Sequence, residues 1–192
     1  MIHSADRSGY FGASDTKYVM RDNHTTESWN SWWGVKCGRK PNQFTGNVYT
    51  RAGTVWEHPI LEAVDDGITT DGQIIIEDLR IRVNYDGYKG GTIYEVKTHN
   101  AAKDFEVKKE YWQQCQVEMY VYKTMSDKWF LPEFKKLYIV SYPLDGDDYY
   151  TEEPVVNPSK INMELIEYDE KFVTKYLKKV KKLAKKLEKE LE

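Results

Sequence analysis

The sequence predicts an α/β protein in which helices flank a central mixed β-sheet. Helical spacing of apolar residues alternates along the chain with short runs that alternate apolar and polar residues, in the order helix, helix, strands, helix, strand, helix. The chain has 192 residues, a length that suits one domain with a substantial core. We therefore expect a single domain over residues 1–192, with a core at about 7–143 and a long amphipathic helix at about 164–191.

The first segment combines small residues with a short apolar-periodic stretch. The run Gly12-Ala13-Ser14-Asp15 predicts a turn that leads into a helix, with Ser14 or Asp15 as the N-cap. Residues 26–38 then place three tryptophans at helical spacing, which is more typical of core packing than of a base-stacking platform: Trp29, Trp32 and Trp33.

A polar loop at residues 39–50 precedes a second amphipathic helix at 47–64. Three strand candidates follow it, at 73–77, 80–86 and 92–98. The glycine-rich residues 88–91 separate the second candidate from the third, so we expect these two strands to form a hairpin.

The rest of the chain predicts a helix at 104–125, an internal strand at 136–143 and the final helix at about 164–191. Lysines cover the polar face of that last helix between Lys171 and Lys189. Three interpretations of this face remain open: a solvated surface with helical ion pairs, a contact with the DNA backbone, or a helix that packs between subunits.

Composition excludes several classes of protein. The net charge of −3 argues against a protein that coats DNA with its whole surface, so any contact with nucleic acid must be local. Cys37 and Cys115 lie far apart and lack the spacing of metal ligands, so we expect reduced thiols. Without a stretch of about 20 apolar residues or a signal layout, we expect no membrane contact and a cytoplasmic location.

Acidic and basic residues near the predicted hairpin suggest a site that binds a metal ion. Asp86 closes one strand candidate, and the next contains Glu95-Val96-Lys97. Because side chains alternate along a strand, Glu95 and Lys97 project from the same face, with Asp86 close by on the neighbouring strand. Two carboxylates and an ammonium group that converge in this way suit a hard, oxygen-liganded metal beside a lysine that handles protons.

Each of these residues also has an ordinary structural interpretation. Glu57, on the helix before the strands, could be an exposed helix residue, and Asp86-Gly87 could be a turn former. Gln114 and Gln116 could be polar helix positions. Taken together, however, a helical carboxylate, a strand-end aspartate, Glu-x-Lys and a glutamine-bearing helix form one ordered pattern.

That pattern resembles the PD-(D/E)XK nuclease superfamily, with Tyr85-Asp86 in place of the usual Pro-Asp pair. Within it, four blocks are similar in order and spacing to the YqaJ-like viral recombinase family, of which lambda exonuclease is the best-known member. The blocks cover about residues 7–122 and are Gly12-Ala13-Ser14-Asp15, Asp86-Gly87, Glu95-Val96-Lys97 and Gln114-Cys115-Gln116-Val117-Glu118-Met119. The resemblance implies a restriction-endonuclease-like core.

The resemblance also implies roles for the residues of this chain. Asp86, Glu95, the backbone carbonyl of Val96 and Glu57 would bind Mg²⁺, with Mn²⁺ able to substitute. Lys97 would orient or deprotonate the attacking water, and Gln114 would position that water or Lys97. The substrate contacts implied by the resemblance are Arg7 and Ser14 at a terminal 5′-phosphate, and Gln116, whose register against Gln114 is ambiguous.

The function that the resemblance implies is a magnesium-dependent exonuclease that acts from the 5′ end of double-stranded DNA in phage-type recombination. Its partners would be DNA ends and a single-strand annealing protein, in a bacterial host cell if the protein is phage-encoded. Members of the family assemble as ring-shaped trimers, so a homo-oligomer is expected. An endonuclease or nickase with the same fold, and a non-catalytic DNA-binding module, remain as alternatives.

Overall fold

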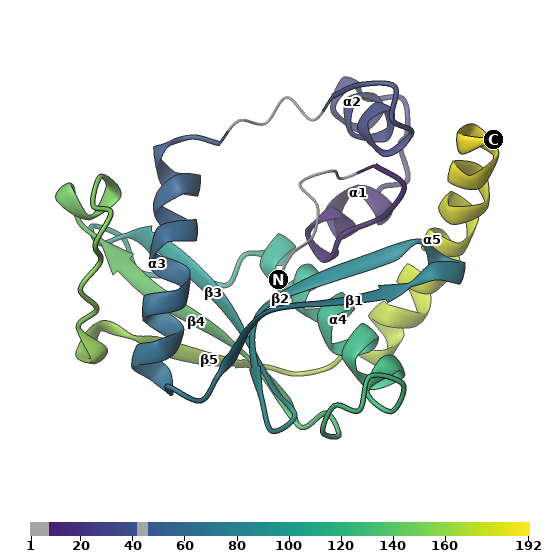
Figure 1. The fold of residues 1–192 in the computed structure, drawn as a ribbon. Coiled ribbons are helices and arrows are strands. Elements are labelled where there is room, and N and C mark those ends of the chain that lie inside the picture. Colours follow the sequence, from purple (N-terminus) through teal and green to yellow (C-terminus); the bar gives the residue numbers. More distant parts are fainter. Residues whose placement is uncertain (1–7, 42–45) are drawn as a thin grey trace.

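A computed structural model of the chain describes residues 8–41 and 46–192 (Figure 1). The strands of this part form one sheet in the order β1-β2-β3-β4-β5. Only β3 and β4 run parallel, while the other neighbours are antiparallel, so the predicted mixed sheet is confirmed. The strand bounds are β1 Thr69–Ile76, β2 Ile81–Lys89, β3 Thr92–Asn100, β4 Lys136–Leu144 and β5 Asn162–Ile166.

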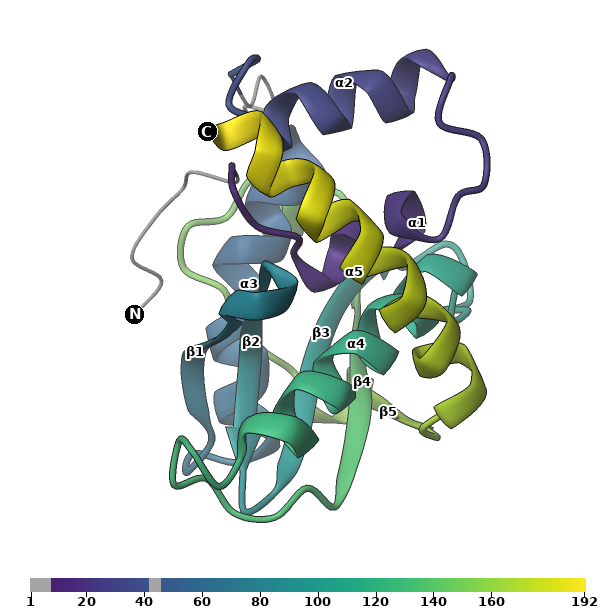
Figure 2. The same ribbon diagram turned by 90° about the vertical axis from the view of Figure 1, so that its right-hand side faces the viewer.

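Helices cover the two faces of the sheet. Helix α3 (Val48–Val64) lies on one face, and α4 (Lys109–Met125) lies on the other, with α5 (Glu170–Leu191) packed beyond it (Figures 1 and 2). The apolar residues separate accordingly into two buried clusters. One cluster joins α3 to β3 and β4, and the larger one joins β2 to α4, α5 and the N-terminal segments.

The predicted strand hairpin is confirmed. Strands β2 and β3 pair antiparallel up to Lys89↔Thr92, and the turn between them consists of Gly90 and Gly91. Both glycines have positive φ angles of 56° and 86°, a conformation that other residues adopt only at a cost. The predicted helix at 47–64 is confirmed as α3, where the side chain of Asn47 caps the first turn by accepting from Thr50 N.

The N-terminal segment follows the sequence prediction closely. A 3-10 turn, Ala13–Asp15, leads into the short helix α1 (Thr16–Val19), and α2 spans Glu27–Lys36. Asp15 precedes α1 but does not cap it. Its buried carboxylate accepts from Gly12 N (2.7 Å) and Trp32 Nε1 (2.8 Å) and pairs with Lys36 (2.5 Å). Asp15 therefore ties α2 to the turn before α1.

All three tryptophans of α2 are buried, which confirms that they form part of the core. Trp29 and Trp33 stack with ring centroids 5.4 Å apart, and the ammonium of Lys186 on α5 lies 5.0 Å from the ring of Trp33. These contacts join α2 to the C-terminal helix.

The first strand, predicted from residue 73, begins at Thr69, and two boundaries of helices are also wrong. The helix predicted from residue 104 begins at Lys109, because residues 105–108 run extended, with Phe105 and Val107 packed against the core and their neighbours exposed. The final helix, predicted from about residue 164, begins at Glu170, because residues 162–166 form the edge strand β5 against β4. Asp169 marks the true start by accepting from Phe172 N (2.9 Å).

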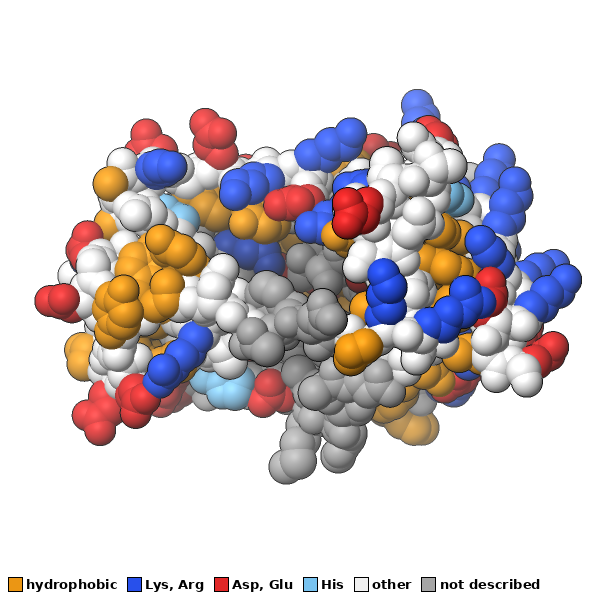
Figure 3. Space-filling model, turned by 90° about the horizontal axis from the view of Figure 1, so that it is seen from above, with side chains coloured by type: hydrophobic (Ala, Val, Ile, Leu, Met, Phe, Trp, Pro, Cys, Tyr) orange, Lys and Arg blue, Asp and Glu red, His pale blue; other side chains and the backbone are white. Residues whose placement is uncertain are grey.

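Helix α5 buries its apolar stripe within the chain. Its buried side chains are Val173, Tyr176, Val180, Leu183, Ala184 and Leu187. The opposite face carries exposed lysines, and one lysine, Lys179, turns back to pair with Asp22 (2.6 Å). Figure 3 shows Lys and Arg side chains gathered along the edge of the molecule where α5 ends, and Asp and Glu side chains gathered at the opposite edge. None of the helices in the described segments is long and apolar enough to cross a membrane.

Candidate active site

Strands β2 and β3 separate at Asp86. Their last backbone pair in this direction is Gly87↔Tyr94, so continued pairing would place Asp86 opposite Glu95. Instead, the N–H of Val96 donates to Asp86 Oδ2 at 2.8 Å, so a side chain takes the place of a backbone acceptor. Where the strands separate, the Asp86 carboxylate points towards β3.

The same position distorts the alternation of side chains. Tyr85 and Tyr88 lie three residues apart in β2, yet both rings contact Tyr122 of α4, with centroids 6.0 and 6.4 Å away. Regular alternation would put them on opposite faces. On β1, the register passes from Thr70↔Gly87 to Gly72↔Tyr85 and skips Asp71, whose φ of 57° lies in the left-handed region. The pairing of β2 with both neighbouring strands is therefore interrupted at Asp86.

Glu95, Lys97 and Gln114 are in direct contact. Glu95 is 2% exposed, and its Oε1 accepts from Lys97 Nζ at 2.5 Å and from Gln114 Nε2 at 2.6 Å. Strand alternation places Glu95 and Lys97 on the face covered by α4, which brings the Gln114 amide within reach. Lys97, on the predicted strand face, and Gln114, on the predicted helix, thus donate to the same oxygen atom, Oε1 of Glu95.

A further carboxyl group, Glu118, belongs to this cluster and was not predicted as a site residue. It lies one turn after Gln114 on α4, is fully buried, and its Oε1 accepts from Gln114 Nε2 at 2.9 Å. Its other oxygen, Oε2, has no hydrogen-bond partner among the described residues. Burial and the charge of Glu95 raise the pKa of Glu118 well above its ordinary value.

Glu57 approaches the cluster from the other side of the sheet. Its helix, α3, packs on β3, and burial together with the charge of Glu95 raises the pKa of Glu57 from 4.5 to about 7. Glu57, His58 and Asp71 also bring one ligand atom each within 4.8 Å of one another, and His58 lies 3.3 Å from Asp71. Asp71 was missed from the sequence, because the predicted strand began at residue 73.

Lys97 is the cation of this cluster. Burial alone would lower its pKa, but the carboxylates of Glu95 and Asp86 outweigh that effect, so the pKa of Lys97 lies above its ordinary value. Its side chain also lies over the ring of Tyr111, 5.0 Å from the centroid. Lys97 is therefore an ammonium donor in this arrangement.

The donor set suits a hard divalent cation. Burial and the charges of Glu95 and Glu57 raise the pKa of Asp86 well above its ordinary value, as neighbouring acids do for Glu57 and Glu118. Carboxylates that raise one another's pKa values, together with the unpartnered oxygen of Glu118, indicate a shortage of positive charge that Lys97 alone does not supply. Oxygen donors of this kind are the ligands that Mg²⁺ and Mn²⁺ prefer.

Gln116, predicted as a substrate contact, does not reach this cluster. It is fully buried, its Nε2 donates to the carbonyl of Glu167 (2.9 Å), and its Oε1 accepts from Asp169 N (2.7 Å). Both ends of the amide thus hold the segment before α5, because Gln116 lies two residues beyond Gln114, on another side of the helix. Its contact with substrate stays a prediction. Of the two glutamines, Gln114 is the one that contacts Glu95.

The predicted phosphate contacts lie at the N-terminal segment. Ser14 is exposed in the turn Ala13–Asp15, which packs against the first part of α4 and against β2. Arg7 lies outside the described residues. His99, at the end of β3, places Nδ1 3.1 Å from the carbonyl of Lys103, and its ring lies 5.4 Å from that of Phe105.

The fold is similar to that of solved exonucleases. An alkaline exonuclease (LHK-Exo) from Laribacter hongkongensis aligns with a TM-score of 0.64 and 20% identity over 95% of this chain and 90% of its own. The same enzyme in complex with dAMP aligns with a TM-score of 0.65. A phage-related exonuclease from Haemophilus somnus 129PT aligns with a TM-score of 0.57 and 17% identity over 95% of this chain and 96% of its own.

The chain has the fold of these exonucleases. At 20% identity or less, the likeness establishes the architecture of sheet and helices and nothing finer. No protein-family model matches the sequence. No curated protein matches it significantly.

Proposed function

We propose that the protein is a magnesium-dependent DNA exonuclease that hydrolyses phosphodiester bonds from the 5′ end of duplex DNA in phage-type recombination. The observation that carries this proposal is the buried Glu95–Lys97–Gln114 contact beside Asp86 and Glu57, at the point where β2 and β3 separate. The exonuclease names of the structural neighbours support it.

In this proposal, Asp86, Glu95, the carbonyl of Val96 and Glu57 hold the metal. When bound, Mg²⁺ polarises the scissile phosphate and lowers the pKa of a coordinated water. The N–H of Val96 fixes the Asp86 carboxylate, and Gln114 fixes Glu95, so both ligands are held in place before the metal arrives. Glu57 reaches the same point from α3, on the opposite face of the sheet.

Lys97 acts as a positive charge and hydrogen-bond donor. Its raised pKa keeps it protonated, so it donates to the attacking water or to the developing charge on the phosphate oxygens. A metal ion held by Glu95 would offset part of the negative charge that raises the pKa of Lys97, which would bring Lys97 closer to the range of a general base. Gln114 orients Glu95 and, through it, Lys97.

The remaining parts of the proposal concern the substrate and the assembly. Ser14, together with Arg7, would hold a terminal 5′-phosphate by hydroxyl donation and by charge. A single-strand annealing protein as partner, a trimeric ring and a cytoplasmic location in a bacterial host complete it. They derive from the family resemblance, and sedimentation of the purified protein tests the ring.

A degradation assay tests the function. Linear duplex, labelled at one end and carrying a 5′-phosphate or a 5′-hydroxyl, is incubated with the protein and Mg²⁺ beside a covalently closed circle. We expect loss from the phosphorylated 5′ end, sparing of the circle, and at least a 100-fold slower reaction in Lys97→Ala, because a positioned electrostatic donor contributes about 10²–10³ in rate.

Lys128→Ala, which removes an exposed lysine beyond the C-terminal end of α4, is the matched control and should degrade DNA at the normal rate. If the closed circle were cut as fast as the linear duplex, the protein would be an endonuclease rather than an exonuclease. Undiminished activity in Lys97→Ala would remove this site from the chemistry, and no cleavage by the unaltered protein would favour the non-catalytic module.

A further inference from the structure

We propose that a cationic groove between α1 and the start of α4 binds a phosphate group of the DNA strand whose end occupies the candidate active site. This inference rests on the proposed function for the identity of the strand. The resemblance to nucleases implies no role for the residues that line this groove. They are Lys17, Met20, Arg21, Lys108, Lys109, Glu110 and Gln113.

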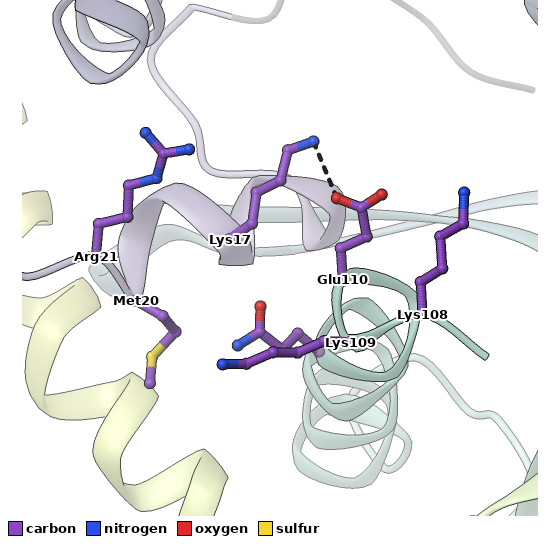
Figure 4. Close-up of a pocket in the computed structure, with 7 residues that line it drawn as sticks. Lys17, Met20, Arg21, Lys108, Lys109 and Glu110 are labelled. Carbon is purple, nitrogen blue, oxygen red and sulfur yellow. Dashed lines mark hydrogen bonds and ion pairs between the residues drawn. The ribbon is translucent and has the colours of Figure 1, made fainter. Parts of the chain in front are cut away.

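The groove is an open hollow of about 480 Å³. Lys17 projects from α1, and Met20 and Arg21 follow that helix, while Lys108, Lys109 and Glu110 begin α4 (Figure 4). Cations thus approach one space from two separate elements. Among the described lining residues, four are basic and Glu110 is acidic.

The charges in the groove are incompletely neutralised. Lys17 pairs with Glu110 at 3.5 Å, and Arg21 donates to the hydroxyl of Ser28 at 2.7 Å. Lys108 and Lys109 are exposed and form no ion pair within residues 8–41 and 46–192. In a chain with a net charge of −3, this local excess of positive charge is a suitable place for a polyanion to bind.

Gln113 adds a second, independent observation. It lines the groove and is only 7% exposed, yet its side-chain amide makes no hydrogen bond with any residue that the structure describes. The side chain is thus held by packing, while its amide is open to the groove and is not engaged by the described part of the protein, so it is available to a ligand there. Its NH₂ group is a donor that suits a phosphate oxygen, beside the ammonium groups of Lys108 and Lys109.

The groove is connected to the candidate active site through α4. The ammonium groups of Lys97 and Lys108 lie 5.0 and 5.5 Å from the centroid of the Tyr111 ring. Gln113 faces the groove while its neighbour Gln114 contacts Glu95. One strand can therefore place a phosphate in the groove while another of its phosphates lies at Lys97, with the Tyr111 ring between them.

The ligand is a phosphate of nucleic acid, and it can be a terminal monophosphate or a backbone phosphodiester. Both suit ammonium and amide donors, so the chemistry of the groove is common to the two. Because the groove is open rather than enclosed, it also admits a continuous strand. The length and the end group of the DNA distinguish the two sources.

The test measures DNA affinity with Ca²⁺ in place of Mg²⁺, by fluorescence anisotropy of labelled duplex at several salt concentrations. In Lys108→Gln/Lys109→Gln, we expect affinity about tenfold lower and a salt slope lower by about 1–2, because each lost phosphate contact removes about 0.7–0.9 from the slope. The matched control, Lys128→Gln/Lys135→Gln, makes the same charge change at exposed positions between α4 and β4 and should leave both values nearly unchanged.

A loss confined to 5′-phosphorylated DNA identifies a terminal phosphate, and an equal loss with 5′-hydroxyl DNA identifies the backbone. Wild-type affinity and slope in the groove variant, or an equal loss in the Lys128→Gln/Lys135→Gln control, would overturn the proposal. Hydrolysis of bis(p-nitrophenyl) phosphate separates this result from the proposed function, because that small substrate reaches Lys97 without the groove. The groove variant should hydrolyse it normally, whereas absent hydrolysis with intact groove binding would contradict only the nuclease.

Discussion

At Lys97, the cost of burial and the attraction of neighbouring carboxylates act in opposite directions. A buried ammonium group ordinarily loses its proton more easily, but Glu95 at 2.5 Å and the nearby Asp86 reverse the effect. The carboxyl groups lack a comparable number of cations, and their pKa values rise instead. These carboxyl groups therefore keep their protons to a higher pH in the folded chain than in the unfolded chain, so the stability of the fold depends on pH.

The pKa of Glu57 predicts the pH range over which the stability of the fold changes. This pKa is raised from 4.5 to about 7, so the folded chain binds a proton that the unfolded chain has already released in this interval. The stabilising effect is complete below pH 4.5, is lost as the pH rises through about 7, and amounts to up to ~3 kcal/mol. We expect the free energy of unfolding, from urea denaturation in EDTA, to fall across this range.

Glu57→Gln should flatten the profile, because the amide stays neutral at every pH. Glu62→Gln, an exposed position of the same helix, is the control and should keep the wild-type slope. A free energy of unfolding that rises between pH 4.5 and 7, alike in wild type and Glu57→Gln, would contradict the raised pKa.

The sequence predicts the site residues that follow a local rule. Glu95 and Lys97 are two residues apart on a strand, so their common face follows from alternation alone. Glu118 lies four residues after Gln114 on α4, so their common side also follows from helical spacing, but the packing of that side on Glu95 does not. Asp71 follows no local rule, because it comes near Asp86 only through the pairing of β1 with β2.

At the scale of elements, a regular spacing of apolar residues predicts that a helix or strand exists better than it predicts where the element begins and ends. The helix predicted at 47–64 has seven apolar positions at helical spacing and an Asn47 cap, and it is confirmed nearly to the residue. Strand β5 was missed because its residues are mostly exposed, with only Ile166 buried. Such a strand is fixed by backbone pairing with β4, a distant segment that leaves no local pattern.

Helix α5 depends on Gln116 for its orientation. The Gln116 amide bonds the backbone of Glu167 and Asp169, and Asp169 caps the helix. Gln116→Leu removes both bonds and leaves two partly buried backbone groups without this partner, at about 1–2 kcal/mol each. We expect urea denaturation to show a free energy of unfolding lower by about 2–4 kcal/mol, with hydrolysis of a small phosphodiester retained.

Gln114→Leu provides the comparison, since it makes a similar change one half-turn away. It should reduce hydrolysis strongly and stability less, because its partners are Glu95 and Glu118 rather than the backbone of another element. If Gln116→Leu abolished hydrolysis while it left stability intact, the residue would belong to the site after all.

At the scale of the whole molecule, the candidate site lies between the two hydrophobic clusters. Glu57 comes from α3, which packs on one face of the sheet, and Gln114 and Glu118 come from α4, on the other. Asp86 and Glu95 are in the sheet between these helices. A cation bound there would connect both layers, so its binding should be measurable as stability of the entire domain.

This connection gives the last prediction. At a concentration 100 times its dissociation constant, Mg²⁺ or Mn²⁺ should stabilise the folded chain by about 2.7 kcal/mol. For a domain of this size, each kcal/mol raises Tm by about 2–4 °C, so differential scanning calorimetry should show a rise of roughly 5–11 °C at pH 8. The rise should be smaller at pH 5, where protons compete for the carboxylates. Asp86→Asn should lose the rise, while Glu62→Gln keeps it; an equal rise in both variants would place the cation elsewhere.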